Sequence, residues 1–192
     1  MGPEDLVFEQ KALNNTKNYY DVFYKVEHLL FDKAKKPQNI CLIRTKLNIE
    51  FNAQVQPIER YKWDHDIEGS VTITDWNWRE LDRSVQRKLR TLTLETLPRK
   101  KCRHLLKSDF NWAYMCVKIP EDDNFCDFEA GAPVVQNNKL VGITNYGPKC
   151  ANGEPYIITL SYSYEDLIRT KLLGCGNACP TLDNFYILEV DL

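Results

Sequence analysis

The stretch from Cys126 to Ile143 constrains the fold of this chain more than any other. It reads Cys-Asp-Phe-Glu-Ala-Gly-Ala-Pro-Val-Val, continues through Gln136-Asn137-Asn138, and resumes as Lys-Leu-Val-Gly-Ile. Small residues and a proline ahead of β-branched residues indicate a tight loop that enters a buried strand, and the polar triplet indicates a turn into a second strand. We therefore predict a β-hairpin that follows a compact loop.

Apolar and alternating patterns elsewhere predict more short strands and few helices. The predicted strands cover 20–28, 39–44, 71–77 and 89–97, the last ended by Pro98. Residues 101–106 are compatible with one or two helical turns, and 164–173 carries the apolar stripe of an amphipathic helix. The sequence is therefore mostly β in its predicted secondary structure.

Length and charge limit the function classes. With 192 residues the chain can form one large domain or two small lobes around a proper core. Its net charge of −2 argues against a general nucleic-acid binder. No apolar run approaches the ~20 residues needed to cross a bilayer. We expect a soluble protein with no nucleic-acid partner, no membrane partner and no cofactor.

Seven cysteines are too many for inert core residues in a chain of this size, and no pair has Cys-x-x-Cys spacing. We predict disulfides and no metal site. Disulfides imply an oxidising compartment, yet the first residues, Met1 to Asp5, lack the apolar core of a signal peptide. Either the start differs from that of the native product, or the chain stays in the cytosol with reduced thiols.

The segment 126–143 resembles the nucleophile segment of trypsin-like serine proteases, which reads Cys-x-Gly-Asp-Ser-Gly-Gly-Pro-Leu-Val and then Leu-Val-Gly-Ile. Three further segments match in the same order. They are 39–44 for Asn-Asp-Ile-Ala-Leu-Leu, 55–58 for Val-x-Pro-Ile, and 155–159 for Pro-Gly-Val-Tyr-Thr. The resemblance covers residues 6–173 and implies an all-β fold, a two-lobed antiparallel β-barrel of the trypsin-like type with a C-terminal helix.

The same resemblance suggests how one trypsin-like domain is divided. It implies a partial N-terminal barrel at about 6–70, a C-terminal barrel at about 71–163, the helix at 164–173 and an extra tail at 174–192. The family's activation terminus, first strands and catalytic-histidine loop have no counterpart in this sequence. The N-terminal barrel is therefore expected to be incomplete.

The resemblance implies that the catalytic triad is lost. Acyl transfer needs a nucleophile, a base that activates it and a group that orients the base. Ala130 stands at the serine position and Asn39 at the position of the orienting aspartate, and we interpret His28, His65 and His104 as surface or structural residues. A hydrolase that uses Cys41 is an alternative, but that residue matches an interior alanine of the family, and buried free cysteines are usually inert.

The substrate side departs from the family as well. Phe128 replaces the glycine of the oxyanion turn, where bulk is expected to alter the loop. Tyr156 replaces a glycine of the pocket wall, where its phenol would fill the cavity. The remaining positions are Asn124 at the pocket base, Tyr146 and Gly147 where the family has Trp-Gly, and Glu129 for the aspartate that pairs with the activated N-terminus.

These changes together favour a pseudoprotease whose surface serves protein binding or regulation. Neutral substitution in a decayed gene is one alternative. A truncated fragment of a secreted trypsin-like endopeptidase homologue is another.

The resemblance also implies the disulfide pairing. Cys102 would pair with Cys116, and Cys126 with Cys150, the bond that braces the primary specificity pocket of the family. Cys175 and Cys179 form a candidate third pair, which leaves Cys41 free and buried. The cysteines and the family together favour a secreted, extracellular protein.

A basic cluster provides a second class of hypothesis. It comprises Arg99, Lys100, Lys101, Arg103, His104 and Lys107. Such a cluster can bind an acidic partner or a polyanion, although charged runs are usually solvated faces.

The tail contains one more predicted strand. Residues 184–190 are rich in strand-forming residues and too apolar for a disordered end. We predict that they add to the N-terminal lobe as a replacement strand. Pairing with a partner chain is the alternative.

Overall fold

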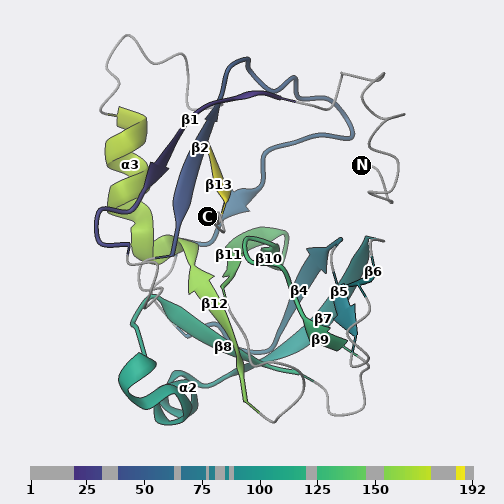
Figure 1. Ribbon diagram of the computed structural model, residues 1–192, viewed down its shortest axis with the longest axis vertical. Helices are drawn as coiled ribbons and strands as arrows, with labels where there is room; N and C mark the ends of the chain where they lie inside the picture. The colour runs from purple at the N-terminus through teal and green to yellow at the C-terminus, as the bar shows by residue number, and fades with distance from the viewer. Residues whose placement is uncertain are drawn as a thin grey trace.

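The computed structural model describes residues 20–31, 39–62, 66–76, 78–80, 85–86, 89–119, 125–145, 154–173 and 185–188. Strands dominate these ranges (Figure 1). In chain order the elements are β1 (Val22–Glu27), β2 (Cys41–Thr45), β3 (Glu59–Arg60), β4 (Ser70–Asp75), β5 (Trp78–Glu80), β6 (Val85–Gln86), β7 (Arg90–Leu97), α2 (Arg99–Leu106), η3 (Lys107–Asp109), β8 (Tyr114–Lys118), β9 (Phe125–Asp127), β10 (Pro133–Gln136), β11 (Lys139–Thr144), β12 (Tyr156–Leu160), η4 (Ser161–Tyr164), α3 (Glu165–Leu173) and β13 (Phe185–Leu188). Within the described ranges, each helix is too short or too polar to span a bilayer.

Six antiparallel strands close into a barrel, which occupies the lower half of Figure 1. The order is β4, β7, β8, β12, β11 and β10, and β10 pairs back to β4. Inward-facing apolar residues fill it, among them Ile73, Leu94, Val117, Val134 and Ile158. Closure leaves these six strands without a free edge. The predicted strands at 71–77 and 89–97 are β4 and β7, and the barrel confirms the predicted fold class.

The predicted hairpin is formed by β10 and β11. Its two turn residues, Asn137 and Asn138, have φ values of 50° and 59°. Positive φ at both central positions is the signature of a type I′ turn, which matches the twist of the flanking strands. Gly142 in β11 lies so close to β12 that a methyl group there would overlap the carbonyl oxygen of Thr159. A glycine is therefore required for this strand pair.

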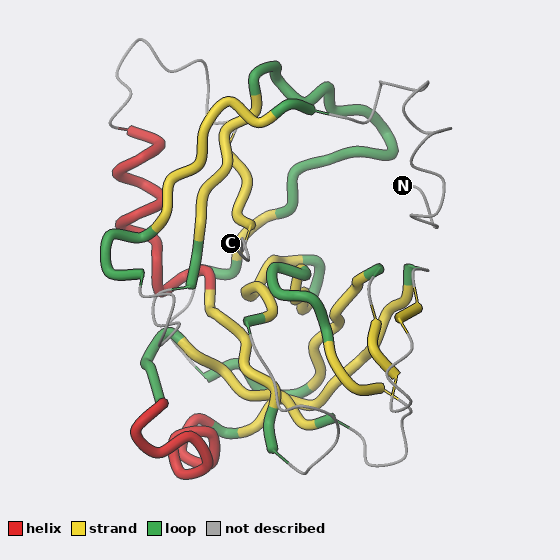
Figure 2. The backbone as a smooth tube through the Cα atoms, viewed as in Figure 1, coloured by secondary structure: helices red, strands yellow, loops and turns green. Residues whose placement is uncertain are grey.

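A second, smaller lobe lies above the barrel in Figures 1 and 2. Its sheet has the order β1, β2, β13, and α3 lies alongside β1 and β2. The lobe has its own small core, in which Leu42 of β2 and Ile168 of α3 pack with Ile143 of the barrel. The predicted strands at 20–28 and 39–44 and the predicted C-terminal helix are confirmed, with a 3₁₀ turn, η4, in front of α3.

The tail adds a strand to this lobe, as the sequence predicted. β13 pairs antiparallel with β2 in a register that places Phe185 opposite Arg44 and Leu188 opposite Cys41. The sheet built by the described residues has three strands and stays open, with β1 and β13 at its edges. This lobe is thus an incomplete barrel in the described part of the chain.

Tyr164 gives a stability prediction. Its side chain is 3% exposed, and in the described structure its hydroxyl has no hydrogen-bond partner. Burial raises the pKa of this phenol, which therefore stays neutral. Because an unsatisfied buried hydroxyl costs about 1–3 kcal/mol, Tyr164→Phe is expected to raise the free energy of unfolding by about 1 kcal/mol in urea titrations.

Tyr162→Phe is the matched control, because the Tyr162 hydroxyl accepts a hydrogen bond of 2.8 Å from Arg99 Nη2. The control is expected to lower stability. A Tyr164→Phe variant that is less stable than the parent would contradict the prediction.

Candidate functional site

The loop ahead of β10 contains the residue at the family's nucleophile position. Ala130 lies in its turn and carries only a methyl group. Gly131 follows with φ 93°, and its N–H donates to the carbonyl of Thr144 at 2.9 Å. Glycine adopts this left-handed conformation without strain. The sharp bend therefore falls at Gly131, immediately after Ala130.

Thr144, at the end of β11, holds this loop from below. Its hydroxyl donates to the carbonyl of Glu129 at 2.6 Å and accepts from the N–H of Ala132 at 2.9 Å. Its own N–H donates to the carbonyl of Ala132 at 2.9 Å. Thr144 is buried, so these bonds are shielded from water and fix both sides of the Ala130 turn.

Asp75, the last residue of β4, holds the loop from the other side. Its Oδ2 accepts from the N–H of Glu129 at 2.9 Å, and its Oδ1 accepts from the N–H of Trp76 at 2.7 Å. The carboxylate is buried. Charge-assisted bonds from backbone N–H groups to a carboxylate are among the stronger protein hydrogen bonds, so Asp75 anchors the loop to the barrel rim.

Phe128 and Tyr156 fill the space beneath the loop. Their rings meet edge to face, with centroids 5.0 Å apart and planes at 90°. The Tyr156 hydroxyl donates to the Phe128 carbonyl at 3.0 Å. Phe128 is 4% exposed and Tyr156 is 1% exposed, and both belong to the barrel core. The two predicted site residues, Phe128 and Tyr156, thus contact each other and connect β12 to the loop.

Asn39 connects the two lobes through a chain of buried side chains. Its Nδ2 donates to Asn145 Oδ1 at 3.0 Å, and Asn145 Nδ2 donates to the Thr159 hydroxyl at 2.9 Å. All three residues are buried. Each group in this chain is neutral, so it offers no carboxylate to stabilise an imidazolium.

The described histidines are not part of the hydrogen-bonded series Asn39–Asn145–Thr159. His28 Nδ1 accepts from the N–H of Leu30 at 3.2 Å, and its ring packs edge to face on Tyr164 at 5.6 Å. Burial lowers the pKa of His28. His104 is exposed on α2, and His65 lies outside the described residues. In the ranges that the structure covers, neither His28 nor His104 bonds to Ala130 or Asn39.

The cysteines agree with two of the predictions. Cys102 and Cys116 form a disulfide between α2 and β8. Cys41 is free and buried, and burial raises the pKa of its thiol, which disfavours the nucleophilic thiolate. The other predictions concern residues whose side chains lie outside the described part, and they stay predictions. These residues are Cys126, Cys150, Cys175, Cys179, Asn124, Tyr146 and Gly147.

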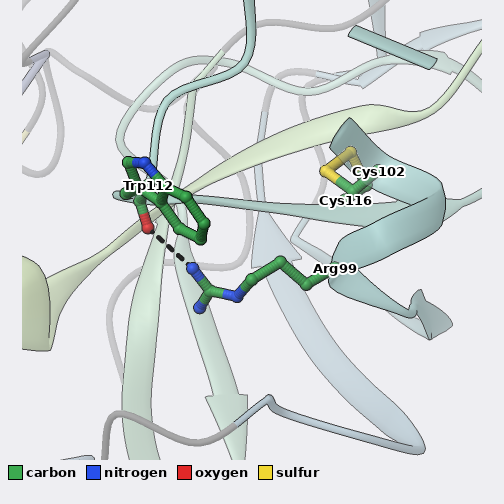
Figure 3. The surroundings of a disulfide bond; sticks show 4 residues. All are labelled: Arg99, Cys102, Trp112 and Cys116. Carbon is green, nitrogen blue, oxygen red and sulfur yellow. Dashed lines mark hydrogen bonds between the residues drawn. A yellow bond between two sulfur atoms is a disulfide. The ribbon is translucent and has the colours of Figure 1, made fainter. Parts of the chain in front are cut away.

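The basic cluster separates into an inner residue and an outer group. Arg99 points inward (Figure 3), where it donates to Asp66 Oδ1 at 2.7 Å and to the Trp112 carbonyl at 3.1 Å. Burial by itself would lower the pKa of Arg99, but its hydrogen bonds to Asp66 and Tyr162 raise it. Arg99 is therefore a structural residue. The outer side chains line a hollow of about 780 Å³, together with Pro98; they are Lys100, Lys101, Arg103, His104 and Lys107.

The described side chains assemble no cluster of three or more His, Cys, Asp and Glu that could hold a metal ion. Among the described residues, the side chains that bond to the backbone on either side of Ala130 are the buried carboxylate of Asp75 and the hydroxyl of Thr144. Their chemistry is that of a hydrogen-bonded scaffold. The methyl group at position 130 is not itself a nucleophile.

Sequence reasoning missed three residues of this scaffold, namely Asp75, Thr144 and Asn145. Each stands at or just after the end of an observed strand, since Asp75 ends β4, Thr144 ends β11 and Asn145 follows Thr144. A polar residue at such a position is a usable signal, because buried polar groups need hydrogen-bond partners. Apart from Trp76, which follows Asp75 directly, their partners are 12 to 106 residues away in sequence.

The family model described as Trypsin matches residues 7–168. A chymotrypsin, Chymotrypsin-2 of Vespa crabro, is 27% identical over 163 residues, which cover 81% of this chain and 73% of that protein. Trypsin II-P29 of Gallus gallus is 26% identical over 157 residues, which cover 77% of this chain and 60% of that protein.

The fold agrees with a solved protease structure. Neuropsin, a serine protease expressed in the limbic system of mouse brain, superposes with a TM-score of 0.72. The match covers 79% of this chain and 71% of neuropsin, at 18% sequence identity. Because the Trypsin family model matches residues 7–168, which are most of this sequence, the chain belongs to the trypsin family.

Proposed function

We propose that this chain is a catalytically silent member of the trypsin family that serves as a protein-binding or regulatory module. The observation that carries the proposal is Ala130, a methyl group at the nucleophile position, in a loop fixed by Thr144 and Asp75. Without a hydroxyl or thiol there, no acyl-enzyme can form at this turn.

A second change at a distance supports the same conclusion. Asn39 takes the position of the orienting aspartate, and its Nδ2 donates a hydrogen bond to Asn145 Oδ1 at 3.0 Å. In serine proteases the carboxylate sets the tautomer of the histidine and stabilises its cation, and an amide does neither. Members of a triad act as a unit, so losing one removes most of the rate and restoring one does not recover it.

The loop geometry also favours binding over turnover. Phe128 and Tyr156 pack against each other, and the family resemblance places Phe128 at the oxyanion turn and Tyr156 at the wall of the specificity pocket. Side chains that fill the core here make a rigid surface and leave a substrate side chain less space. A rigid surface suits a partner-binding module, because little ordering is needed on association.

We expect no hydrolysis and no labelling. The purified chain, incubated with a panel of fluorogenic peptides and with a serine-directed fluorophosphonate, is expected to match the blank. Ala130→Ser alone is expected to stay inactive, because Asn39 keeps its amide and no described histidine bonds to this turn. Trypsin run in parallel is the positive control, and circular dichroism shows that the variant is folded. Turnover or labelling that a single substitution in this chain abolishes would refute catalytic silence.

The second candidate is a fragment of a longer secreted endopeptidase homologue. The Cys102–Cys116 disulfide supports secretion, because disulfides persist in oxidising compartments. The native protein distinguishes the two candidates. Its intact mass and N-terminal sequence show whether a histidine-bearing segment precedes the residues described here.

A further inference from the structure

The outer face of α2 forms a basic pocket. Lys100, Arg103 and His104 stand at positions i, i+3 and i+4 of α2, which places them along one face, and Lys107 follows at the C-cap of the helix. Together with Pro98 and Lys101 they line a hollow of about 780 Å³. Four of these six residues carry a full positive charge, on a chain whose net charge is −2. The pocket is therefore a local concentration of cationic groups.

The lysine charges of the pocket are unpaired in the described structure. Several other surface cations there are paired, such as Lys46 with Asp21 at 3.0 Å and Lys139 with Glu59 at 3.3 Å. Within the same described ranges, Lys100, Lys101 and Lys107 form no ion pair. The acidic residue that follows the helix, Asp109, accepts from the Ser108 hydroxyl at 3.4 Å. The pocket charges are thus available to an external anion.

An apolar surface borders the pocket. Trp112 is 65% exposed, and the Arg103 guanidinium lies 5.8 Å from its ring centroid. Phe110 and Trp112 pack edge to face with ring centroids 5.4 Å apart, and the pocket itself includes Pro98 and the methylene stems of the lysines. Arg103 connects the cationic pocket with this aromatic surface. A ligand that combines carboxylates with an apolar side chain fits both parts, whereas a sulfated polysaccharide uses the charges alone.

The basic face is also held rigidly. Figure 3 shows α2 joined to β8 by the Cys102–Cys116 disulfide, while Arg99 reaches across to the Trp112 carbonyl. Arg99 also binds Asp66 and Tyr162, so the helix is fixed at its first turn as well. Preorganised side chains lose less conformational entropy when a ligand binds.

We infer that the α2 pocket binds an acidic peptide segment of a partner protein, one that carries an aromatic or aliphatic side chain beside its carboxylates. This inference rests on the proposed function of a protein-binding module and names the class of its partner. From Lys100 to Leu106 the helix rises about 9 Å at 1.5 Å per residue, and Lys107 follows at its C-cap. Carboxylates on alternate residues of an extended peptide repeat about every 7 Å, so three of them span about 14 Å and cover this basic face.

The test uses a defined probe. A fluorescein-labelled peptide containing Glu-Phe-Glu-Leu-Glu is titrated with the protein, and binding is followed by anisotropy. Removal of two of the charges, Lys100→Gln with Lys107→Gln, is expected to weaken binding at least about tenfold, and raising salt to about 0.5 M is expected to weaken it further because screening shortens to a few ångströms. The matched control, Arg169→Gln with Lys171→Gln, removes the same charge from α3 and is expected to leave the affinity unchanged.

Two further arms identify the ligand class. Trp112→Ala keeps the backbone carbonyl that Arg99 binds, and it is expected to weaken the Phe- and Leu-containing peptide but not a Glu-Ser-Glu-Ser-Glu peptide. A heparin hexasaccharide that binds while both peptides do not would overturn the inference, and so would equal losses in the α2 and α3 variants. These outcomes are independent of hydrolysis, because peptide binding at α2 and labelling at Ala130 are measured separately.

Discussion

Removal of the Cys102–Cys116 disulfide is expected to lower the free energy of unfolding by about 3 kcal/mol. The bond spans 14 residues of sequence, and closing a loop of about that length restricts the unfolded chain by about 3 kcal/mol. Cys102→Ala with Cys116→Ala is the suitable variant, because both cysteines are fully buried and serine would bury unsatisfied hydroxyls. Urea titration followed by tryptophan fluorescence measures the change.

The comparison with reduced parent protein provides the control. Dithiothreitol treatment of the parent is expected to move its urea midpoint toward that of the variant, and to leave the variant where it was. The acidic-peptide affinity is expected to fall in parallel, because α2 loses its covalent attachment to β8. A stability loss well below about 1 kcal/mol would show that the bond does not restrict the unfolded chain as the loop length implies.

Much of the barrel is predictable from sequence, because its strands carry local signals. The alternation of Leu and Thr in 89–97 reappears as β7, with a half-buried pattern that ends before Pro98. The pair Asn137-Asn138 at the hairpin turn has positive φ at both positions, as a type I′ turn requires. Patterns of two to nine residues are sufficient for such elements, since the physical cause lies within the segment itself.

The candidate site is less predictable, because long-range contacts assemble it. Ala130 and Asn39 can be identified by comparison with the family motif, because each lies within a single short segment that can be compared by itself. Asp75, by contrast, meets Glu129 across 54 residues, and Asn39 meets Asn145 across 106. Closure of the barrel and docking of the lobes bring these groups together, and neither event leaves a mark in the local sequence pattern.

Arg99 shows why charge runs mislead. The sequence places it in a basic cluster with Lys100, and nothing local separates the two residues. Asp66 precedes β4 by four residues and Arg99 follows β7 by two, and because β4 and β7 are antiparallel neighbours, both residues lie at the same end of this strand pair. The long-range fold thus pairs Arg99 with an acid, while Lys100, one residue further along the helix, is exposed to solvent.

The tail strand β13 covers an edge of β2 that could otherwise pair with another chain. β2 is paired on one side by β1 and on the other by β13. Among the described elements, β13 alone covers that second edge of β2. A strand edge that loses its partner exposes N–H and C=O groups, which a second copy of the chain can pair with.

Deletion of residues 181–192 is accordingly expected to destabilise the protein and to make it aggregate. The deletion removes the β13 register that joins Tyr186 to Ile43 and Ile187 to Leu42. A loss of roughly 2 kcal/mol corresponds to a melting temperature lower by about 4–8 °C in a protein of this size. Differential scanning fluorimetry measures the shift, and size-exclusion chromatography with light scattering measures association. Deletion of residues 189–192 alone keeps β13 and is expected to leave both properties near those of the parent.

A chain truncated at residue 180 that stays monomeric and melts at the same temperature as the parent would show that β13 contributes nothing to the lobe. If the parent instead forms dimers that this truncation dissolves, the strand pairs between two copies, as the alternative prediction for this tail requires.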